Sequence, residues 1–291
     1  MLPSLYSGIS GLRANQQKLN VVANNIANSS TTGFKTQSMN FQDMISQTLS
    51  DSSAPEGDFG GINAKQIGLG VRVGGVNTDF TNGSMQTTNR NLDFAIDGTG
   101  YFVVKAGDKQ YYTRDGVFVL DREGNLLTQD GNYVMGYDPT ETIDTKNAPG
   151  VKLSIKQYYT DSKTGSNTGE ATDKVSSFSV SPKTGIISVK VANGNTYNVG
   201  QIALASFPNE GGLLKTGGNL YSTSLNSGNP AYGVAANGGF GDINQGMLEM
   251  SNVDLAQQFT DMIIAQRAFQ ANGKIISTDD EVLQDLVNLK R

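Results

Sequence analysis

Two amphipathic patterns, one near each end of the chain, dominate its distribution of hydrophobic and polar positions. In residues 1–30, steps of four and three connect Leu5, Ile9, Leu12, Gln16, Leu19, Ala23 and Ile26. In residues 245–291, the same steps connect Leu255, Phe259, Met262, Gln266, Phe269, Gly273 and Ile276, and Leu283 lies seven residues further on. This spacing marks one face of an α-helix and, when sustained, a coiled coil. The sequence therefore predicts two terminal helices that pack on each other.

The apolar surface of the C-terminal helix is wider than a two-helix contact needs. A second stripe overlaps the first and runs through Ile263, Ala268, Ala271, Ile275, Val282, Leu286 and Leu289. Its own domain, the N-terminal helix or neighbouring copies of the chain could cover this surface. Amphipathic helices usually pack on their own domain. Here the loosely patterned segments 35–70 and 209–244 tether the helices poorly to the β domain, which favours coverage by other copies. The helices would then become ordered on assembly. A head-to-tail contact that does not close builds a helical polymer.

We expect self-assembly to use the apolar positions of both helices. They are Leu5, Ile9, Leu12, Leu19, Ala23, Ile26, Leu255, Phe259, Met262, Phe269, Ile276 and Leu283. The polar Gln16 and Gln266 either set the register of the contact or lie at a wet edge of it.

Two local signals bear on the bounds of the C-terminal helix. Ser251 and Asp254 form a Ser-x-x-Asp variant of the capping box just before its apolar stripe. Gly273 could end one helix, with Thr278 and Glu281 capping a second. Because the apolar stripe resumes at Ile276, a single helix is favoured.

Between the helices, the pattern predicts an extended linker and then a β domain. Residues 31–70 are weakly patterned; Phe41, Met44, Ile45 and Leu49 could form a short helix, and a Ser/Pro/Gly/Asp-rich loop follows. Residues 71–244 hold short strand-like runs separated by Gly and Asp turns: 71–76, 94–96, 101–105, 110–113, 117–120, 126–128, 133–137, 178–181, 186–191 and 197–207. Polar excursions are expected at 140–149 and 160–174, and an irregular return at 209–244. The predicted fold class is a mainly β, antiparallel sandwich or barrel with terminal helices.

Composition and charge exclude several classes of function. The net charge is −5 and no basic stretch stands out, so neither a nucleic-acid partner nor an anionic membrane surface is indicated. The chain has no Cys and no His, which removes disulfides and the commonest general base and transition-metal ligand. No apolar run has the length of a membrane span, and no cleavable signal peptide is expected.

The candidate chemistry is weak. Asp93 and Asp97 could form the carboxylate pair of a glycosidase, but Asp before Gly98 is typical of a turn. The glycines around residues 68–74 lack dinucleotide-binding spacing, and residues 121–125 lack the ligands of a calcium loop. We therefore expect no catalytic, cofactor or metal site, and no enzyme.

Several motifs resemble those of the bacterial flagellar rod and hook proteins. At the N-terminal end these are residues 7–12 and 23–28, with Asn24, Asn25 and Asn28, and then 32–35, with Gly33, Phe34 and Lys35. At the C-terminal end they are residues 251–255, with Ser251, Asn252, Val253 and Asp254, and 266–272, with Gln266 and Arg267. Residues 92–102 and 112–116 are similar to the central β motif of the family.

The resemblance implies a structural protein of the bacterial flagellum that is exported by the type III apparatus and assembles with itself into a helical tube. Residues 280–291 look most like those of hook subunits, whose tube is a flexible joint transmitting torque from motor to filament; a distal rod subunit of the basal body is the alternative. Implied partners are other copies, the rod, hook-cap and hook-filament junction proteins and the export apparatus. A secreted carbohydrate-binding or carbohydrate-cleaving β protein is the remote alternative.

Overall fold

The computed structural model describes residues 2–55, 60–138, 148–155, 158–159, 173–192 and 194–289. These divide into two compact units. The helix unit consists of Met1–Asn28, Thr36–Asp79 and Val253–Arg291, and the β unit of Ser29–Lys35 and Phe80–Asn252. The chain thus enters and leaves the β unit more than once.

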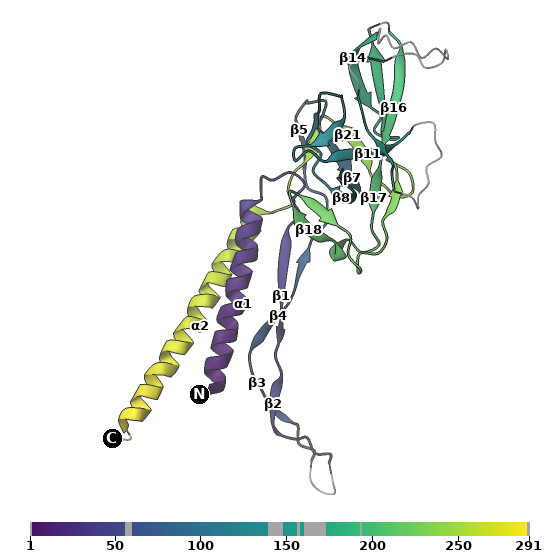
Figure 1. Cartoon of the computed structure of the whole chain (residues 1–291). Coiled ribbons are helices and arrows are strands. Elements are labelled where there is room, and N and C mark those ends of the chain that lie inside the picture. The colour runs from purple at the N-terminus through teal and green to yellow at the C-terminus, as the bar shows by residue number, and fades with distance from the viewer. Residues whose placement is uncertain are drawn as a thin grey trace. The chain divides into compact units, whose positions relative to one another are not determined.

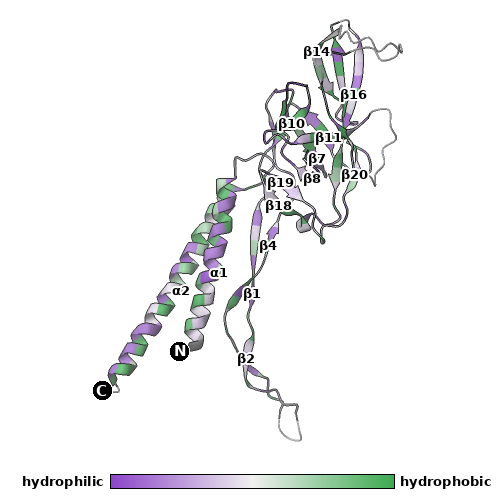
Figure 2. Ribbon diagram, in the orientation of Figure 1, coloured by the Kyte–Doolittle hydropathy of each residue, from purple (hydrophilic) through white to green (hydrophobic). Residues whose placement is uncertain are grey.

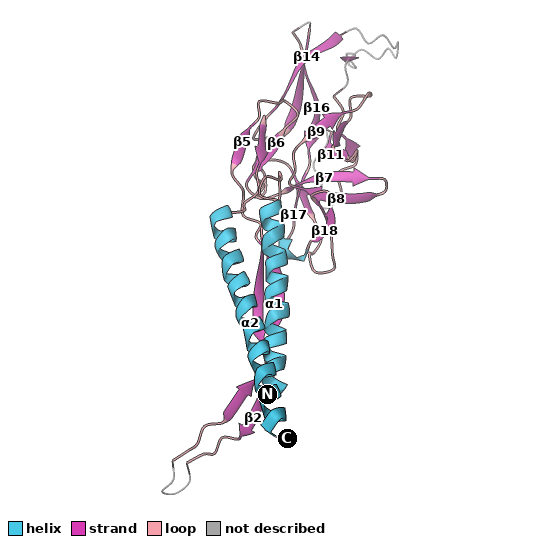
Figure 3. Ribbon diagram, turned by 90° about the vertical axis from the view of Figure 1, so that its left-hand side faces the viewer, coloured by secondary structure: helices cyan, strands magenta, loops and turns pink. Residues whose placement is uncertain are grey.

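The helix unit is built on two antiparallel helices that lie side by side (Figures 1 and 3). Helix α1 spans Leu2–Ala27 and α2 spans Leu255–Leu289. Helix α2 runs through Gly273 without interruption, so the prediction of a single helix is confirmed. A side chain at Gly273 would meet no atom within 4 Å, so this glycine is not required by packing.

Four strands complete the helix unit and form a long, two-stranded ladder. Strand β1 (Gln37–Asp43) pairs with β4 (Val71–Thr78), and β2 (Ser46–Ser50) pairs with β3 (Lys65–Gly68), both antiparallel. The short helix predicted through residues 41–49 is therefore wrong. Its apolar residues are exposed, Phe41 and Leu49 on strands and Met44 and Ile45 between them, because backbone pairing with residues 65–78 overrides the local pattern.

This ladder also changes the predicted organisation of the chain. Residues 31–70 contain paired strands rather than only a linker. Strand β4 belongs to the helix unit, although the β domain was predicted to begin at residue 71. The reason is its partner: β4 pairs along its length with β1, from Gln37 opposite Thr78 to Asp43 opposite Val71.

The β unit is antiparallel throughout its described strand pairs, which confirms the predicted fold class. Its strands are β5 (Met85–Thr87), β6 (Phe94–Asp97), β7 (Tyr101–Ala106), β8 (Lys109–Thr113), β9 (Phe118–Leu120), β10 (Leu126–Thr128), β11 (Tyr133–Tyr137), β12 (Val151–Lys152), β13 (Tyr158–Tyr159), β14 (Asp173–Val180), β15 (Ile186–Val191), β16 (Thr196–Ile202), β17 (Leu204–Ser206), β18 (Leu214–Gly217), β19 (Leu220–Ser222), β20 (Ala231–Gly233), β21 (Asp242–Gln245) and β22 (Met247–Glu249). The main sheet follows the order β13-β14-β15-β16-β11-β7-β8-β19-β18, with β9, β10, β12, β17 and β20 attached to it. Separate pairs join β21 to β6 and β22 to β5.

The core of the β unit has two apolar clusters. One gathers fully buried residues of the central motif, such as Phe94, Ile96 and Phe102. The other is rich in aromatic rings, including Tyr101, Tyr112 and Phe207. Tyr112 and Phe207 pack edge to face with ring centroids 4.8 Å apart. Fully buried aromatic side chains bring much of the stability of such a domain.

Three sequence predictions in this unit need correction. The predicted irregular return at 209–244 contains β18 to β21, whose short Gly- and Asn-containing runs are held by backbone pairing rather than by an alternating pattern. The run 197–207 is split at Ala203 into β16 and β17, which have different partners. Residues 245–254 are not helical; they include strand β22. The predicted excursions at 140–149 and 160–174 lie mostly outside the described residues.

Candidate assembly interface

The contact between the two helices includes small and polar residues of α1 as well as apolar ones. A Cβ atom added at Gly11 would lie 2.7 Å from Asn272 Nδ2, and one at Gly8 would lie 3.3 Å from Ile276 Cγ1. Polar contacts extend this line of approach in both directions. Ser4 Oγ donates to Asp279 Oδ2 at 2.6 Å, and Lys18 Nζ lies 3.4 Å from Asp261 Oδ1. The backbones can come this close because glycine has no side chain.

The seam is therefore displaced by one residue from the predicted stripe of α1. Its contacts fall at Ser4, Gly8, Gly11, Lys18 and Asn25, each one position before a residue of the predicted stripe. The predicted residues flank this line. On α1, Leu5, Leu12, Leu19 and Ile26 are half-buried, whereas Ile9 and Ala23 are exposed. On α2, Met262, Ile276 and Leu283 are half-buried.

A close seam leaves the large apolar side chains of α2 uncovered. Phe259 is 51% exposed, Ile263 58% and Phe269 39%. Leu255, Ile264 and Ile275 are exposed as well. Figure 2 shows hydrophobic segments alternating with hydrophilic ones along the visible surface of both helices. An apolar stripe of this length on a helix is typical of a surface that another chain covers.

Asn25 has a structural role that the sequence did not reveal. Its side chain is fully buried, and Nδ2 donates to Gln37 O at 2.7 Å and to Gln258 Oε1 at 2.9 Å. Its Oδ1 accepts from Gln37 N at 3.0 Å. Asn25 therefore joins the end of α1 to the start of β1 and to α2. Asn24 and Asn28 bond each other at the last turn of α1, as expected of residues that end a helix.

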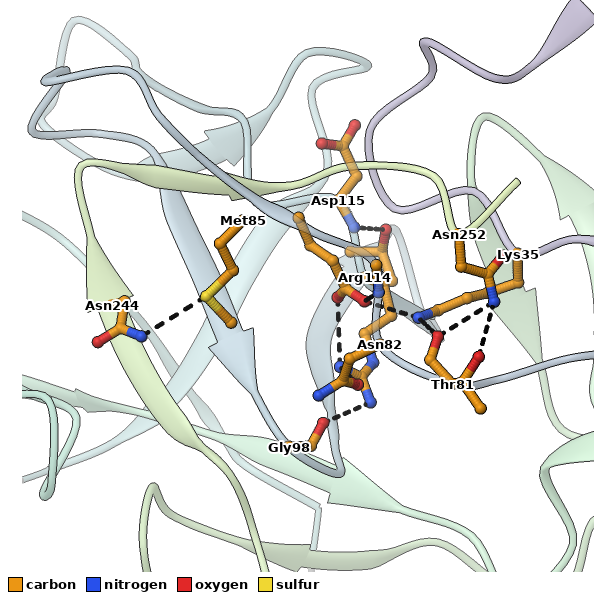
Figure 4. A network of polar contacts seen from close by, with 12 residues as sticks. Lys35, Thr81, Asn82, Met85, Gly98, Arg114, Asp115, Asn244 and Asn252 are labelled. Carbon is orange, nitrogen blue, oxygen red and sulfur yellow. Dashed lines mark hydrogen bonds and ion pairs between the residues drawn. The ribbon is translucent and has the colours of Figure 1, made fainter. Parts of the chain in front are cut away.

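In the β unit, Lys35 belongs to a buried ionic cluster that Figure 4 shows in part. Lys35 Nζ lies 2.6 Å from Glu249 Oε1, and Arg114 lies 3.3 Å from Glu249 Oε2. All three side chains are at most 2% exposed. Burial lowers the pKa of the Lys35 ammonium, while Glu249 acts in the opposite direction. One carboxylate thus compensates two buried cations.

The cluster holds together segments that are far apart in sequence. Lys35 Nζ also donates to Thr81 O at 2.8 Å, and Asn252 Nδ2 donates to the same oxygen at 3.1 Å. Gly83 N donates to Glu249 Oε1 at 3.0 Å. These residues adjoin points at which the chain passes between the two units. The cluster therefore fixes, on the β-unit side, the ends of segments that continue into the helix unit.

The remaining motif residues are placed by local geometry. Gly33 has φ +66°, and a Cβ atom there would lie 2.8 Å from the backbone of Arg114, so the predicted turn requires glycine. Phe34 is buried, with Lys215 Nζ 4.8 Å from its ring centroid. Asp254 Oδ1 accepts from the backbone N–H of Ala256 and Gln257.

Asp254 is thus the cap of α2, and the predicted role of Ser251 in a capping box is wrong. Ser251 lies buried in the β unit, too early in the chain to cap a helix that begins at Leu255. Val253 is half-buried, and Gln266 and Arg267 are exposed on α2. Arg114 lies within the central β motif at residues 112–116, but the sequence assigned it no role, and no sequence signal pointed to Glu249.

The described residues offer little for other chemistry. They contain no group of three or more His, Cys, Asp or Glu side chains that could hold a metal ion. None of the helices in that same part of the chain is both long and apolar enough to cross a membrane. Asp93, the first residue of the carboxylate pair considered above, is buried. It forms an ion pair with Arg90 and accepts a hydrogen bond from Thr88, so these contacts stabilise the local fold.

Comparison with known proteins agrees with this arrangement. Residues 5–35 match the family described as flagella basal body rod protein, residues 95–189 the flagellar hook protein FlgE/F/G D1 domain, and residues 244–289 the C-terminal part of flagellar basal body rod FlgEFG proteins. The flagellar basal-body rod protein FlgG of Bacillus subtilis is 47% identical, with all of both chains covered. The hook protein FlgE of Borreliella burgdorferi is 31% identical and its rod protein FlgG 34% identical, again with all of each chain covered.

The two ends of the chain and its central β motif thus define a flagellar axial protein. The chain belongs to the family of flagellar rod and hook proteins. It is accordingly a structural protein of the bacterial flagellum and not an enzyme.

Proposed function

We propose that this chain is a rod-type subunit of the flagellar basal body that assembles with itself into a helical tube through its terminal helices. The observation that carries the proposal is the apolar stripe of α2, which the close seam with α1 leaves exposed. Neighbouring copies would cover it. The proposed assembly residues are those of the two predicted stripes, Leu5, Ile9, Leu12, Leu19, Ala23, Ile26, Leu255, Phe259, Met262, Phe269, Ile276 and Leu283.

The magnitude of this burial favours a polymer over an isolated dimer. Full burial of one large apolar side chain contributes about 1.5–3 kcal/mol, so burying the exposed half of six of them gives roughly 5–9 kcal/mol. Loss of translational and rotational freedom costs about 4–15 kcal/mol per association. A single contact is then marginal. A tube, in which each subunit meets several neighbours, gains several contacts for one loss of freedom.

The rod is supported over the hook by two features of the relatives. Identity is 47% to the Bacillus rod protein and 31% to the Borreliella hook protein. The alignment with the rod protein extends over 292 residues, but that with the hook protein extends over 441, although this chain has 291. The rod relative thus aligns almost without insertion, whereas the hook relative contains a large additional segment. The similarity of residues 280–291 to hook subunits weighs less than this agreement over the whole chain.

Further partners follow from the proposed place in the axial structure. A rod subunit would contact other rod proteins and the first hook subunits, after passage through the type III export apparatus. Direct contacts with the hook cap and the hook-filament junction proteins would belong to a hook subunit, so a rod subunit is not expected to make them.

Substitution of an exposed apolar residue tests the assembly surface. We expect Phe269→Glu to leave the monomer folded, because the side chain is already 39% exposed, and to abolish tube formation at concentrations where the unmodified chain polymerises. Leu12→Glu should act in the same direction. Ser277→Glu, which adds the same charge at an exposed polar position of α2, serves as the matched control. Circular dichroism reports folding, and pelleting with electron microscopy reports tubes. Normal yields of tubes from Phe269→Glu would contradict the proposal.

Electron microscopy of a deletion strain separates rod from hook. A rod subunit predicts basal bodies that lack the distal rod and everything built on it. A strain with a complete rod and no curved hook would instead show that the chain is a hook subunit.

A further inference from the structure

An apolar groove lies within the helix unit, between α1, the start of β4 and the residues beside these strands. Its volume is about 610 Å³. The lining residues are Tyr6, Ile9, Ser10, Arg13, Ala14 and Gln17 of α1, Met44 after β1, and Leu69, Val71, Arg72 and Val73 at and before β4. Ser10 Oγ accepts from Val71 N at 3.2 Å and closes its floor. We call this feature the α1 groove.

The end of α2 carries an apolar segment that α1 does not cover. The helices are antiparallel, and Ser4, in the first turn of α1, contacts Asp279. Residues 282–289 therefore continue past the first residue of α1, as Figure 1 shows, and we call them the α2 overhang. Val282 is 49% exposed, Val287 66% and Leu289 83%. Val282 and Leu289 are seven residues apart and share one face of the helix, whereas Val287 lies on another side of it.

The overhang and the groove match in length and in charge. Eight helical residues extend about 12 Å, and the stretch of α1 from Tyr6 to Gln17 extends about 16 Å, at about 1.5 Å per residue. The groove lining holds Arg13 and Arg72 and no acidic residue. Neither arginine is ion-paired within the described part of the chain. The overhang contains Asp285 and directly follows Asp280 and Glu281.

The overhang cannot enter the groove of its own chain. It extends beyond the end of α1 at which the groove begins, and α2 is one continuous helix up to Leu289. Reaching back would require α2 to break and reverse. The partner must therefore be another molecule.

We propose that the α2 overhang of one copy docks in the α1 groove of a second copy. Val282 and Leu289 enter the groove, Val287 lies at its rim, and the acidic side chains face Arg13 and Arg72. Donor and acceptor are different surfaces of the same chain, so the contact is heterologous and propagates along a polymer. This is helix-in-groove recognition, in which an amphipathic helix lays its apolar face in a hydrophobic channel. The inference rests on the proposed self-assembly and specifies one contact within it.

Cross-linking of introduced cysteines tests the contact. The chain has no cysteine, so Gln17→Cys and Val287→Cys together provide one reactive group in the groove and one on the overhang. We expect a short bismaleimide to convert assembled full-length chains of this variant into a ladder of dimers, trimers and higher oligomers. Each single-cysteine variant should stay monomeric on a denaturing gel, and a mixture of the two should give dimers only.

Charge reversal provides a second test, measured by the fraction of chains that the bismaleimide cross-links. We expect Arg13→Glu with Arg72→Glu to lower the cross-linked fraction about fivefold, because like charges then face each other. Adding Glu281→Lys and Asp285→Lys should restore it. Arg267→Glu, which reverses an exposed arginine of α2 outside the groove, is the control and should leave the fraction unchanged.

The outcomes separate this inference from the proposed function. Tubes of normal yield that give no cross-link between positions 17 and 287 would overturn the docking contact while leaving self-assembly intact. A ladder from Gln17→Cys with Leu49→Cys, in place of the expected one, would show that the β2–β3 strands of a second copy occupy the groove and would also overturn it. A full-length chain that forms no polymer and no cross-link would overturn both proposals.

Discussion

Replacing Glu249 by glutamine should destabilise the β unit more than any other single charge-neutralising change in the ionic cluster. Its carboxylate accepts from Lys35 at 2.6 Å, from Arg114 at 3.3 Å and from Gly83 N at 3.0 Å. Glutamine has almost the same shape but no charge. Its amide nitrogen would also place a donor where the carboxylate now accepts. The change therefore removes the carboxylate that ion-pairs with both buried cations, although Glu210 still interacts electrostatically with them.

The size of the effect follows from the burial of all three side chains. Removing one partner of a buried ion pair costs about 3–5 kcal/mol, because the remaining charge stays out of water. At about 2–4 °C per kcal/mol for a domain of this size, the midpoint of thermal unfolding should fall by roughly 6–20 °C. Lys35→Met should cost less, since Glu249 keeps Arg114 and Thr81 O keeps its bond from Asn252. In the double variant the two costs should not add, with a coupling of about 1–3 kcal/mol.

Urea unfolding of the full chain under monomeric conditions measures these differences. The chain has no Trp, so near-ultraviolet circular dichroism of the buried tyrosines reports the β unit. Asp108→Asn, which neutralises an exposed acid in the turn between β7 and β8, is the control and should change the free energy of unfolding by less than about 0.5 kcal/mol.

The dependence on pH provides a further check. Burial already lowers the pKa of Lys35 from 10.5, and loss of Glu249 removes a group that raises it. In Glu249→Gln the unfolded chain therefore binds more protons than the folded chain between the lowered folded-state pKa of Lys35 and 10.5. Its deficit in the free energy of unfolding should narrow as the pH rises towards that value. A cost below about 1 kcal/mol at pH 7, or no coupling with Lys35→Met, would refute the view that the cluster depends on this one carboxylate.

Two further predictions concern the helix seam and the β unit. Gly11→Leu should push α1 away from α2, because a Cβ at this position would already lie 2.7 Å from Asn272 Nδ2. It should therefore lower helix content and assembly, whereas Asn20→Leu, at an exposed position, should not. Circular dichroism of both variants measures the helix content, and an equal loss in the two would contradict the close seam. Burial raises the pKa of the Asp115 carboxyl above 3.8, so the free energy of unfolding should fall as the pH rises from 3.8 through the folded value. Asp115→Asn should remove that slope while keeping a side-chain oxygen that can accept from Thr32. An unchanged slope in pH-dependent urea unfolding would contradict the assignment.

Much of the fold could be predicted from local pattern. The two terminal helices follow from their four-three periodicity. Strands β4, β6 to β11, β15 and β16 and the end of β14 follow from strand-like runs separated by Gly and Asp turns. The surplus of apolar positions on α2 was also visible, because counting residues on a helix face needs no knowledge of the partner. The rest required partners distant in sequence. Strands β1 to β3 and β18 to β22 have little alternation of their own and exist because backbone groups elsewhere in the chain pair with them.

The sequence by itself determined that both ends of this chain are amphipathic helices with more apolar surface than one contact can cover. It could not say which face of each helix meets the other, because the apolar stripe and the actual line of approach differ by one residue. The tertiary structure decided that the helices meet through Gly8 and Gly11. Glycine lets the backbones come close there, and this packing leaves Phe259, Ile263 and Phe269 exposed. Likewise, Glu249 became significant only when folding buried it between two cations, since the cost of an unpaired charge depends on its removal from water.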